Sequence, residues 1–184
     1  MQNNSGEKVQ PVFDFLNPRL ETLQVNKVNK YLCIDEMMIS SKSKFGPRVY
    51  QKGKPHLWGF KLFGISDPFG IVYKIHLHTD KFKKDDDFLD LGSTANRVFS
   101  LIKNVPRHQN YELYMDNYFL SIPLMNELRK VGIHSMGTIR IPNAAGFSDV
   151  CIPDDELSKL GDRVFAEYLC TGVDIEEPGI RLIR

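Results

Sequence analysis

Two short stretches decide the fold of this chain: YLCIDEMM (residues 31–38) and YELYMDNYF (residues 111–119). In each, a largely apolar run leads into an aspartate, Asp35 or Asp116. A buried strand that ends in this way delivers a carboxylate to the rim of a sheet. Two such carboxylates can share a divalent metal ion. For either motif alone, an aspartate that caps a turn is the alternative interpretation.

The sequence around the first stretch predicts three strands joined by hairpins. Residues 31–40 are strand-like, and a basic loop then begins at 46–47 with Gly-Pro. Residues 57–66 are again strand-like. The turn sequence DPFG at 67–70 has the Pro and Gly placement of a type I turn, and the alternating stretch 71–79 follows it.

The second stretch lies between two predicted helices. Ser93 or Thr94 can cap the first helix, which stops at Pro106 and whose buried side consists of Ala95, Val98, Leu101, Ile102 and Val105. A strand at 111–116 precedes a helix that Ser121 caps and Gly132 ends, and a strand at 133–139 closes the pattern. This α/β order is that of a ribonuclease H-like mixed sheet flanked by helices. In that fold the first and fourth strands are neighbours, which would bring Asp35 and Asp116 together.

Composition indicates an ordinary soluble domain. The 184 residues are 42% hydrophobic and 26% charged, with a formal net charge of +1. No stretch approaches the roughly 20 apolar residues that a membrane span needs, so we expect no membrane partner. The three cysteines are odd in number and lack metal-binding spacing, which favours a reducing intracellular compartment.

Charge is unevenly distributed along the chain. Between Met37 and Ser66 there is no Asp or Glu, whereas six basic residues fall there: Lys42, Lys44, Arg48, Lys52, Lys54 and Lys61. A cationic segment of this kind is either a solvated surface or a binding site for phosphate groups.

Other side chains in this half are weaker candidates. Glu36 points to the strand face opposite Asp35, which disfavours it as a metal ligand. His76 and His78 alternate onto one face of a strand, where we expect exposed surface rather than a metal site. Trp58 and Phe60 are expected to pack on the sheet.

Several linked motifs resemble those of piggyBac-type transposases and their transposable-element-derived relatives. They are IDE (34–36), SSKSKFGPR (40–48), KGKP (52–55), WGFK (58–61), MDNYF (115–119), SIPL (121–124) and GTIR (137–140). The resemblance covers roughly residues 11–184, in order and at family-like spacing.

This resemblance implies a function. Asp35 and Asp116 would be the first two acids of a DDD triad that binds Mg²⁺ or Mn²⁺ for hairpin-forming, cut-and-paste DNA transposition. Five residues after the metal-binding strand would contact DNA phosphates: Lys42, Lys44, Arg48, Lys52 and Lys54. Transposon ends and target DNA would be the partners, and the resemblance further implies a homodimer and a nuclear protein, although no run of five basic residues marks a localisation signal.

The resemblance also suggests a division of the chain. Residues 1–29 would be a tail with a partial upstream element, 30–141 the catalytic core, and 142–184 the start of an insertion. The third aspartate and a cysteine-rich zinc-binding domain are expected beyond it, so this fragment should be inactive alone. Three acids near its end, Asp174, Glu176 and Glu177, are expected to be solvated surface. A non-catalytic, domesticated module that binds DNA or protein is the alternative, and a degenerate gene product is a third reading.

Overall fold

The computed structural model describes residues 9–42, 48–53, 55–79 and 89–138, together with 173–174 and 181–182. In chain order the elements are α1 (Gln10–Lys27), β1 (Tyr31–Ser40), β2 (Arg48–Tyr50), β3 (Trp58–Ser66), β4 (Val72–Leu77), α2 (Ser93–Leu101), β5 (Tyr111–Met115), α3 (Ile122–Lys130), β6 (Ile133–Gly137), β7 (Val173–Asp174) and β8 (Arg181–Leu182). No helix among these described residues is long and apolar enough to cross a membrane.

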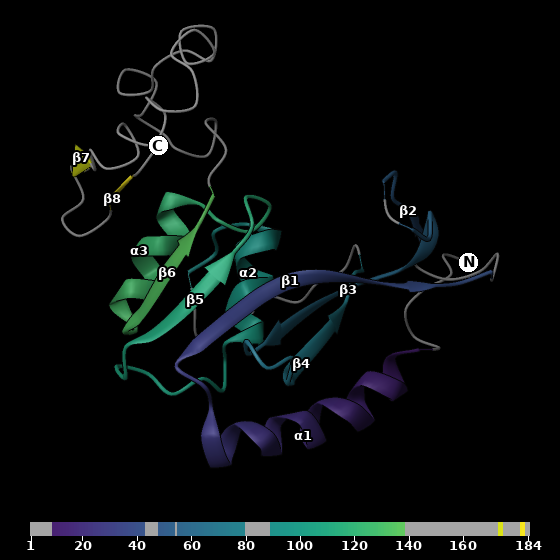
Figure 1. Cartoon of the computed structure of the whole chain (residues 1–184), viewed down its shortest axis with the longest axis horizontal. Helices are drawn as coiled ribbons and strands as arrows, with labels where there is room; N and C mark the ends of the chain where they lie inside the picture. The colour runs from purple at the N-terminus through teal and green to yellow at the C-terminus, as the bar shows by residue number, and fades with distance from the viewer. Residues whose placement is uncertain are drawn as a thin grey trace, which may run out of the picture.

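The main sheet is mixed, with the strand order β2-β3-β1-β5-β6, and β4 also pairs with β3. β1 runs antiparallel to β3 and parallel to β5. Figure 1 shows α2 and α3 together beside the β5–β6 half of the sheet, whereas α1 lies apart from them along β4. The predicted ribonuclease H-like arrangement, with its first and fourth predicted strands side by side, is confirmed.

The two faces of the sheet bury different clusters. Inward-facing residues of β1, β3 and β5 pack with α2 and α3 in the main core, which includes Leu32, Ile34, Phe63, Ile65, Leu113, Val98, Leu101, Leu124 and Leu128. On the opposite face, Phe13 of α1 packs against Leu62 and Leu77. Near β5 and β6 this second face stays open, since Tyr31 and Met136 are 44% and 61% exposed.

The predicted helices are confirmed, with one exception at a cap. Ser121 caps α3 as expected, because its Oγ accepts a hydrogen bond of 3.4 Å from the backbone N–H of Leu124. α2 has no side-chain cap: Gly92 is its N-cap residue, so the expected cap at Ser93 or Thr94 is wrong. Instead Asp90 Oδ1 accepts hydrogen bonds from Gly92 N and Asn96 Nδ2, at 3.0 and 2.8 Å, which braces the start of the helix.

Helix α1 continues through Pro18, although proline inside a helix removes a backbone hydrogen bond and usually kinks or ends the helix. Tertiary contacts explain this tolerance. The side-chain amide of Asn17 donates to the carbonyl oxygen of Ile75 at 2.9 Å and accepts from its N–H at 3.0 Å. The ion pair between Lys74 and Glu21, at 2.9 Å, adds a second tie. α1 therefore covers backbone groups of an edge strand, a position that would otherwise invite another chain.

Strand β2 is an element that the sequence did not indicate. It has three residues inside the basic loop, too few for a period of two to be seen. Its pairing with β3 sets Tyr50 opposite Trp58, and the N–H of Gln51 donates to the carbonyl of Leu57 at 2.8 Å. β2 and β3 thus form a hairpin at the end of the sheet.

The expectation that His76 and His78 are exposed is wrong. Both are half-buried, because α1 and α2 close on strand β4 from either side. His76 Nε2 lies 3.3 Å from the Oγ of Ser100. The ring of His78 meets Phe63 edge-on, with 5.6 Å between ring centroids. Neither histidine therefore belongs to an exposed pair.

The burial of His76 predicts a pH dependence of stability. Burial, and then the positive charge of Lys74, lower the pKa of His76 to about 4; among the smaller effects Glu21 acts in the opposite direction and Arg97 in the same direction. In the unfolded chain this histidine binds its proton near pH 6.5. Between pH 6.5 and pH 4 the unfolded state therefore binds more protons than the folded state, so the free energy of unfolding decreases as the pH is lowered through this range. We expect unfolding to cost about 2 kcal/mol less at pH 5 than at pH 7.

Urea denaturation at both pH values measures this difference. His76→Gln should remove most of the loss, whereas His56→Gln, on an exposed loop, should keep the wild-type slope. Equal losses in wild type and His76→Gln would assign the pH dependence to other groups.

Candidate functional site

Asp35 and Asp116 lie beside each other at one edge of the open face. The residues just before them, Ile34 of β1 and Met115 of β5, are direct partners in the parallel pairing. Asp35 is the next residue of β1 and Asp116 directly follows the end of β5, and both are exposed. Neighbouring strands lie about 4.8 Å apart, so the pairing register places the two carboxylate-bearing residues side by side, as the sequence predicted.

Both aspartates line one open pocket of about 450 Å³. Its walls come from the carboxyl ends of β5 and β6 and from the part of β1 beside them: Cys33, Ile34 and Asp35, then Tyr114, Met115 and Asp116, then Met136, Gly137 and Thr138. The carboxyl ends of parallel strands are where sheets of this kind hold ligands. This pocket is therefore the candidate functional site.

Hydrogen bonds orient the two carboxylates through one oxygen each. Asp35 Oδ1 accepts from the N–H of Glu36 at 2.7 Å. Asp116 Oδ1 accepts from the N–H of Asn117 at 2.6 Å and from Thr138 Oγ1 at 3.3 Å. Within the described part of the chain, Oδ2 of either aspartate has neither a hydrogen bond nor an ion pair, so one oxygen of each remains for a ligand.

The loop that carries Asp116 is anchored in the core. The carbonyl of Asp116 accepts hydrogen bonds from the N–H groups of Phe119 and Leu120, at 3.0 and 3.3 Å. Tyr118 stacks on Phe63 at 6.0 Å, and Phe119 meets the same ring edge-on at 5.5 Å. The two aromatic residues of the MDNYF motif therefore fix the aspartate that precedes them.

Glu36 lies on the other face of β1, as predicted. It forms an ion pair of 2.5 Å with Lys61 and accepts a hydrogen bond from the side chain of Gln51. Lys61 also lies 4.5 Å from the ring centre of Tyr118. Through Lys61, Glu36 therefore stabilises the loop after β5 from the face of the sheet opposite Asp35.

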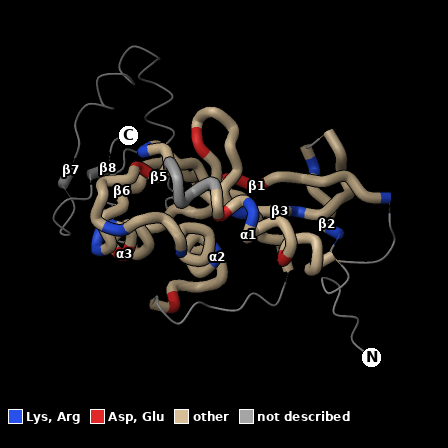
Figure 2. Tube along the Cα trace, turned by 90° about the horizontal axis from the view of Figure 1, so that it is seen from below, with Lys and Arg blue, Asp and Glu red and all other residues tan. Residues whose placement is uncertain are grey.

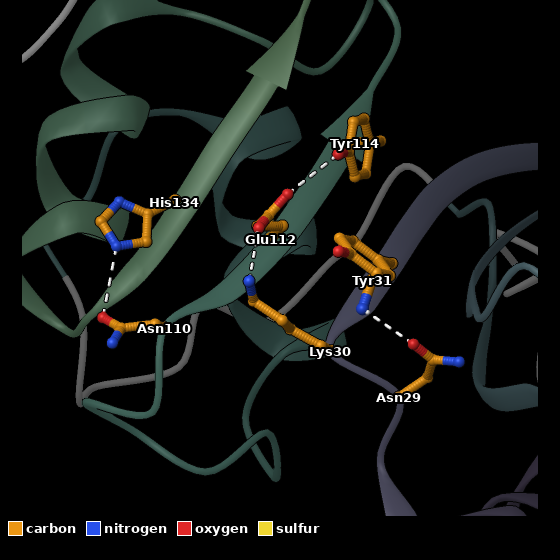
Figure 3. Close-up of polar contacts among 7 residues, drawn as sticks. All are labelled: Asn29, Lys30, Tyr31, Asn110, Glu112, Tyr114 and His134. Atoms are coloured by element: carbon orange, nitrogen blue, oxygen red, sulfur yellow. Dashed lines mark hydrogen bonds and ion pairs between the residues drawn. The ribbon is translucent and has the colours of Figure 1, made fainter.

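A row of polar contacts occupies the far end of the same strands (Figure 3). Lys30 pairs with Glu112 at 2.9 Å, and the hydroxyl of Tyr114 donates to the second oxygen of Glu112 at 3.0 Å. These hydrogen bonds, that of Lys30 first, lower the pKa of Glu112. Glu112 is four residues before Asp116, about 13 Å along the strand. It is therefore not a third carboxylate of the pocket.

The pocket contains side chains that sequence reasoning did not assign. The hydroxyl of Thr138 donates a hydrogen bond to Asp116 because β6 pairs with β5. The GTIR motif does not indicate this contact, since it depends on that strand pairing. Cys33 lies on the same strand face as Asp35, and the residue is exposed although its thiol group is partly buried. This partial burial, and then the negative charge of Asp35, raise the pKa of the thiol. The thiol is therefore a poor thiolate donor at neutral pH.

The predicted basic residues have different surroundings. Lys42 and Lys52 are exposed, whereas the guanidinium of Arg48 lies 4.4 Å from the ring centre of Trp58. Lys44 and Lys54 lie outside the described residues. Figure 2 shows Lys and Arg positions around the β2 end of the sheet. Lys61, by contrast, is paired with Glu36 on the other face.

The donor set of the pocket suits a hard cation. Carboxylate and hydroxyl oxygens from Asp35, Asp116 and Thr138 are the ligand types that Mg²⁺ and Mn²⁺ prefer. Among the residues that the structure describes, no group of three or more His, Cys, Asp or Glu side chains is gathered for a metal. Of the late acids, Asp174 falls in β7, and Glu176 and Glu177 lie outside the described ranges.

Comparisons with known proteins agree with this fold and identify a family. A family model described as Transposase IS4 matches residues 2–155. The chain is 24% identical over 162 residues to the human PiggyBac transposable element-derived protein 3, covering 85% of this chain and 27% of that protein. It is 29% identical over 119 residues to the human PiggyBac transposable element-derived protein 2, covering 61% of this chain and 19% of that protein.

A solved structure gives the same result at the level of the fold. The match is to a cryo-electron microscopy structure of the piggyBac transposase synaptic complex with hairpin DNA, with a TM-score of 0.66 and 22% identity. It covers 81% of this chain and 30% of that chain. The sequence thus spans about a quarter of its relatives' length. It is similar to piggyBac-derived proteins, and because the family model matches most of its residues, this chain belongs to the Transposase IS4 family.

Proposed function

We propose that this chain is part of the DNA-processing core of a piggyBac-like, transposable-element-derived protein. In this proposal Asp35 and Asp116 hold Mg²⁺ or Mn²⁺ beside a DNA phosphodiester. The observation that carries the proposal is the shared pocket: two aspartates from parallel neighbouring strands line it, and within the described part of the chain one oxygen of each makes no hydrogen bond.

A bound divalent ion would stabilise negative charge on phosphate oxygens and make a coordinated water more acidic. The residues of the chain have separate tasks. Thr138 and the N–H of Asn117 hold Asp116 through Oδ1, which keeps Oδ2 directed to the ligand. Phe63 and Tyr118 keep the Asp116 loop in place from the core side.

The basic residues after β1 would contact DNA phosphates. Lys42 and Lys52 are exposed, and Arg48 projects from the same region; Lys44 and Lys54 complete the predicted set. Support comes from the family match and from the relative whose solved structure holds hairpin DNA. Contacts of this type are largely independent of sequence and weaken as salt is added. The homodimer and the nuclear location belong to the same proposal.

Among the described residues the pocket holds two carboxylates, which limits the activity that we expect. A two-metal site for phosphodiester chemistry stabilises both the attacking and the leaving oxygen with its ions. The resemblance to piggyBac-type transposases implies a third acid for such a site. With Asp35 and Asp116 alone, we expect weak metal binding and very low DNA cleavage. The alternative of a non-catalytic module that binds DNA or protein predicts no metal binding at this pocket.

Binding of Mn²⁺ tests the proposal. Titration of Mn²⁺ into wild-type protein, followed by electron paramagnetic resonance of the free ion, should give saturable binding. Asp35→Asn and Asp116→Asn should each weaken Mn²⁺ binding at least about tenfold. Mutation of a residue that only hydrogen-bonds to a metal ligand already lowers metal affinity about 10- to 100-fold. Nicking of a DNA duplex in Mn²⁺, if measurable, should fall in both variants.

Glu112→Gln is the matched control, since this carboxylate lies on the same strand but is bonded to Lys30 and Tyr114. It should bind Mn²⁺ like the wild type. Affinity that is the same in all four proteins would exclude a metal site at Asp35 and Asp116. Absence of saturable binding in the wild type would favour the non-catalytic module.

A further inference from the structure

A second candidate site lies at the β2 end of the sheet. Tyr50 of β2 and Trp58 of β3 face each other directly across the hairpin, with 5.1 Å between ring centroids and 58° between ring planes. The guanidinium of Arg48 lies 4.4 Å from the ring centre of Trp58. We call these three residues the aromatic platform.

The aromatic platform is open to solvent despite these contacts. Tyr50 is 53% exposed and Trp58 48% exposed, so the prediction that Trp58 packs on the sheet is wrong for half of its surface. Phe60, the next residue on the same strand face, is by contrast half-buried under α1. Helix α1 therefore covers Phe60 but not the aromatic platform, which lies further along the sheet and is exposed.

Strand register puts the aromatic platform on the same face as the carboxylate pocket. Asp35 lies opposite Gly64 of β3, and Trp58 is an even number of residues before Gly64 on that strand. Side chains alternate with a period of two, so both point to one side, about 20 Å apart along the sheet. The aromatic platform is thus a separate site on the face of the sheet that carries the pocket.

The surroundings identify the ligand chemistry. From residue 37 to residue 66 the sequence contains no acidic side chain. Arg48 contacts Trp58, Lys52 follows Tyr50 by two residues, and Lys42 follows Ser41, whose N–H donates to the carbonyl of Trp58 at 3.3 Å. Aromatic rings within a cationic surface bind a polyanion that carries flat π-faces, which is a nucleic acid strand with unpaired bases. Paired bases inside a duplex are stacked on both neighbours, so a duplex offers a face to an exposed ring only at its terminal pairs, whereas unpaired bases offer theirs along the strand.

We infer that the aromatic platform binds an unpaired DNA base by stacking on Trp58 and Tyr50, while neighbouring cations hold the backbone. This inference rests on the proposed DNA-processing function and assigns a substrate feature to it: a strand end or loop that is single-stranded near the β2 hairpin. An acidic peptide would satisfy the charges but not the flat faces of the rings.

Trp58 is the single tryptophan of the chain, so its fluorescence reports on the aromatic platform directly. The full chain is titrated with three DNAs at low and moderate salt: a blunt duplex, the same duplex with a three-nucleotide overhang, and that overhang with abasic residues. The overhang with bases should quench Trp58 and bind about fivefold to a hundredfold more tightly than its abasic counterpart. Binding of all three should weaken as salt rises.

Variants separate stacking from a structural role. Trp58→Ala, followed by fluorescence anisotropy of labelled DNA, should lose the difference between base and abasic overhang; Tyr50→Ala should reduce it and retains the tryptophan signal. Phe69→Ala is the control, because that ring is 81% exposed but lies in the turn between β3 and β4. It should leave the difference unchanged.

The outcomes distinguish the two proposals. Salt-sensitive duplex binding without any difference between base and abasic overhangs would overturn the stacking site and leave the DNA-processing proposal intact. No binding of any DNA at low salt would overturn both. Because the base-against-abasic comparison uses wild-type protein, it decides the question even where Trp58→Ala does not fold. Binding of an acidic peptide with no response to bases would assign the surface to a protein partner.

Discussion

Phe63→Ala is expected to lower the free energy of unfolding by about 3–5 kcal/mol, the range for deletion of a buried phenylalanine side chain. Phe63 has no exposed surface, and its ring contacts Tyr118, Phe119 and His78. The cavity would lie between β3 and the loop after β5. Since domains of this size are stable by only about 5–15 kcal/mol, much of the fold's stability would be lost.

Chemical denaturation measures the loss, with Phe69→Ala as the control for an exposed phenylalanine, expected within about 0.5 kcal/mol of wild type. Phe63→Ala should also weaken Mn²⁺ binding, because Tyr118 and Phe119 directly follow Asp116 in the anchored loop. A stable Phe63→Ala protein with wild-type metal affinity would show that the Asp116 loop does not depend on this ring.

Gly137→Ala is expected to destabilise the protein by at least about 3 kcal/mol, the upper end for overpacking. Gly137 pairs with Met115, and a methyl group on it would lie 1.9 Å from the Met115 carbonyl oxygen. That oxygen belongs to the backbone, so no side-chain rotation relieves the clash, and β6 must move away from β5. Thr138 would move with it and lose its hydrogen bond to Asp116.

Thermal denaturation and Mn²⁺ titration of Gly137→Ala test both consequences. His134→Ala is the matched control, because it removes an exposed side chain from the same strand. It should change stability by no more than about 0.5 kcal/mol. If Gly137→Ala were as stable as the control, β5 and β6 would have to tolerate a separation that their present pairing excludes.

The central part of the fold could be predicted because its signals are local. Apolar runs before Asp35 and Asp116 mark strands that are buried in the core, and hydrogen bonding of Ser121 to the N–H of Leu124 follows from sequence spacing alone. Together with the order of helices and strands, these signals specify which two strands are neighbours. The position of the carboxylates at one pocket follows from that order.

Other features depend on tertiary partners that leave no local trace. Pro18 stays inside α1 because the neighbouring Asn17 bonds to Ile75, 58 residues away. His76 is half-buried because α1 and α2 both pack against β4. Trp58 is exposed because no described element covers the β2 end of the sheet. The contribution of Thr138 to the site likewise requires that β6 pair with β5.

The parallel pairing of β1 with β5 has a kinetic consequence. Tyr31 and Glu112 are partners although 81 positions (112 minus 31) separate them. The entropy of closing so long a loop must be lost before the pairing gains any contact, which slows folding. The carboxylate pair therefore exists only in chains that have completed the centre of the sheet. A divalent ion that needs both aspartates would act as a ligand of the native state alone, raising the melting temperature in proportion to the logarithm of its concentration once above its dissociation constant.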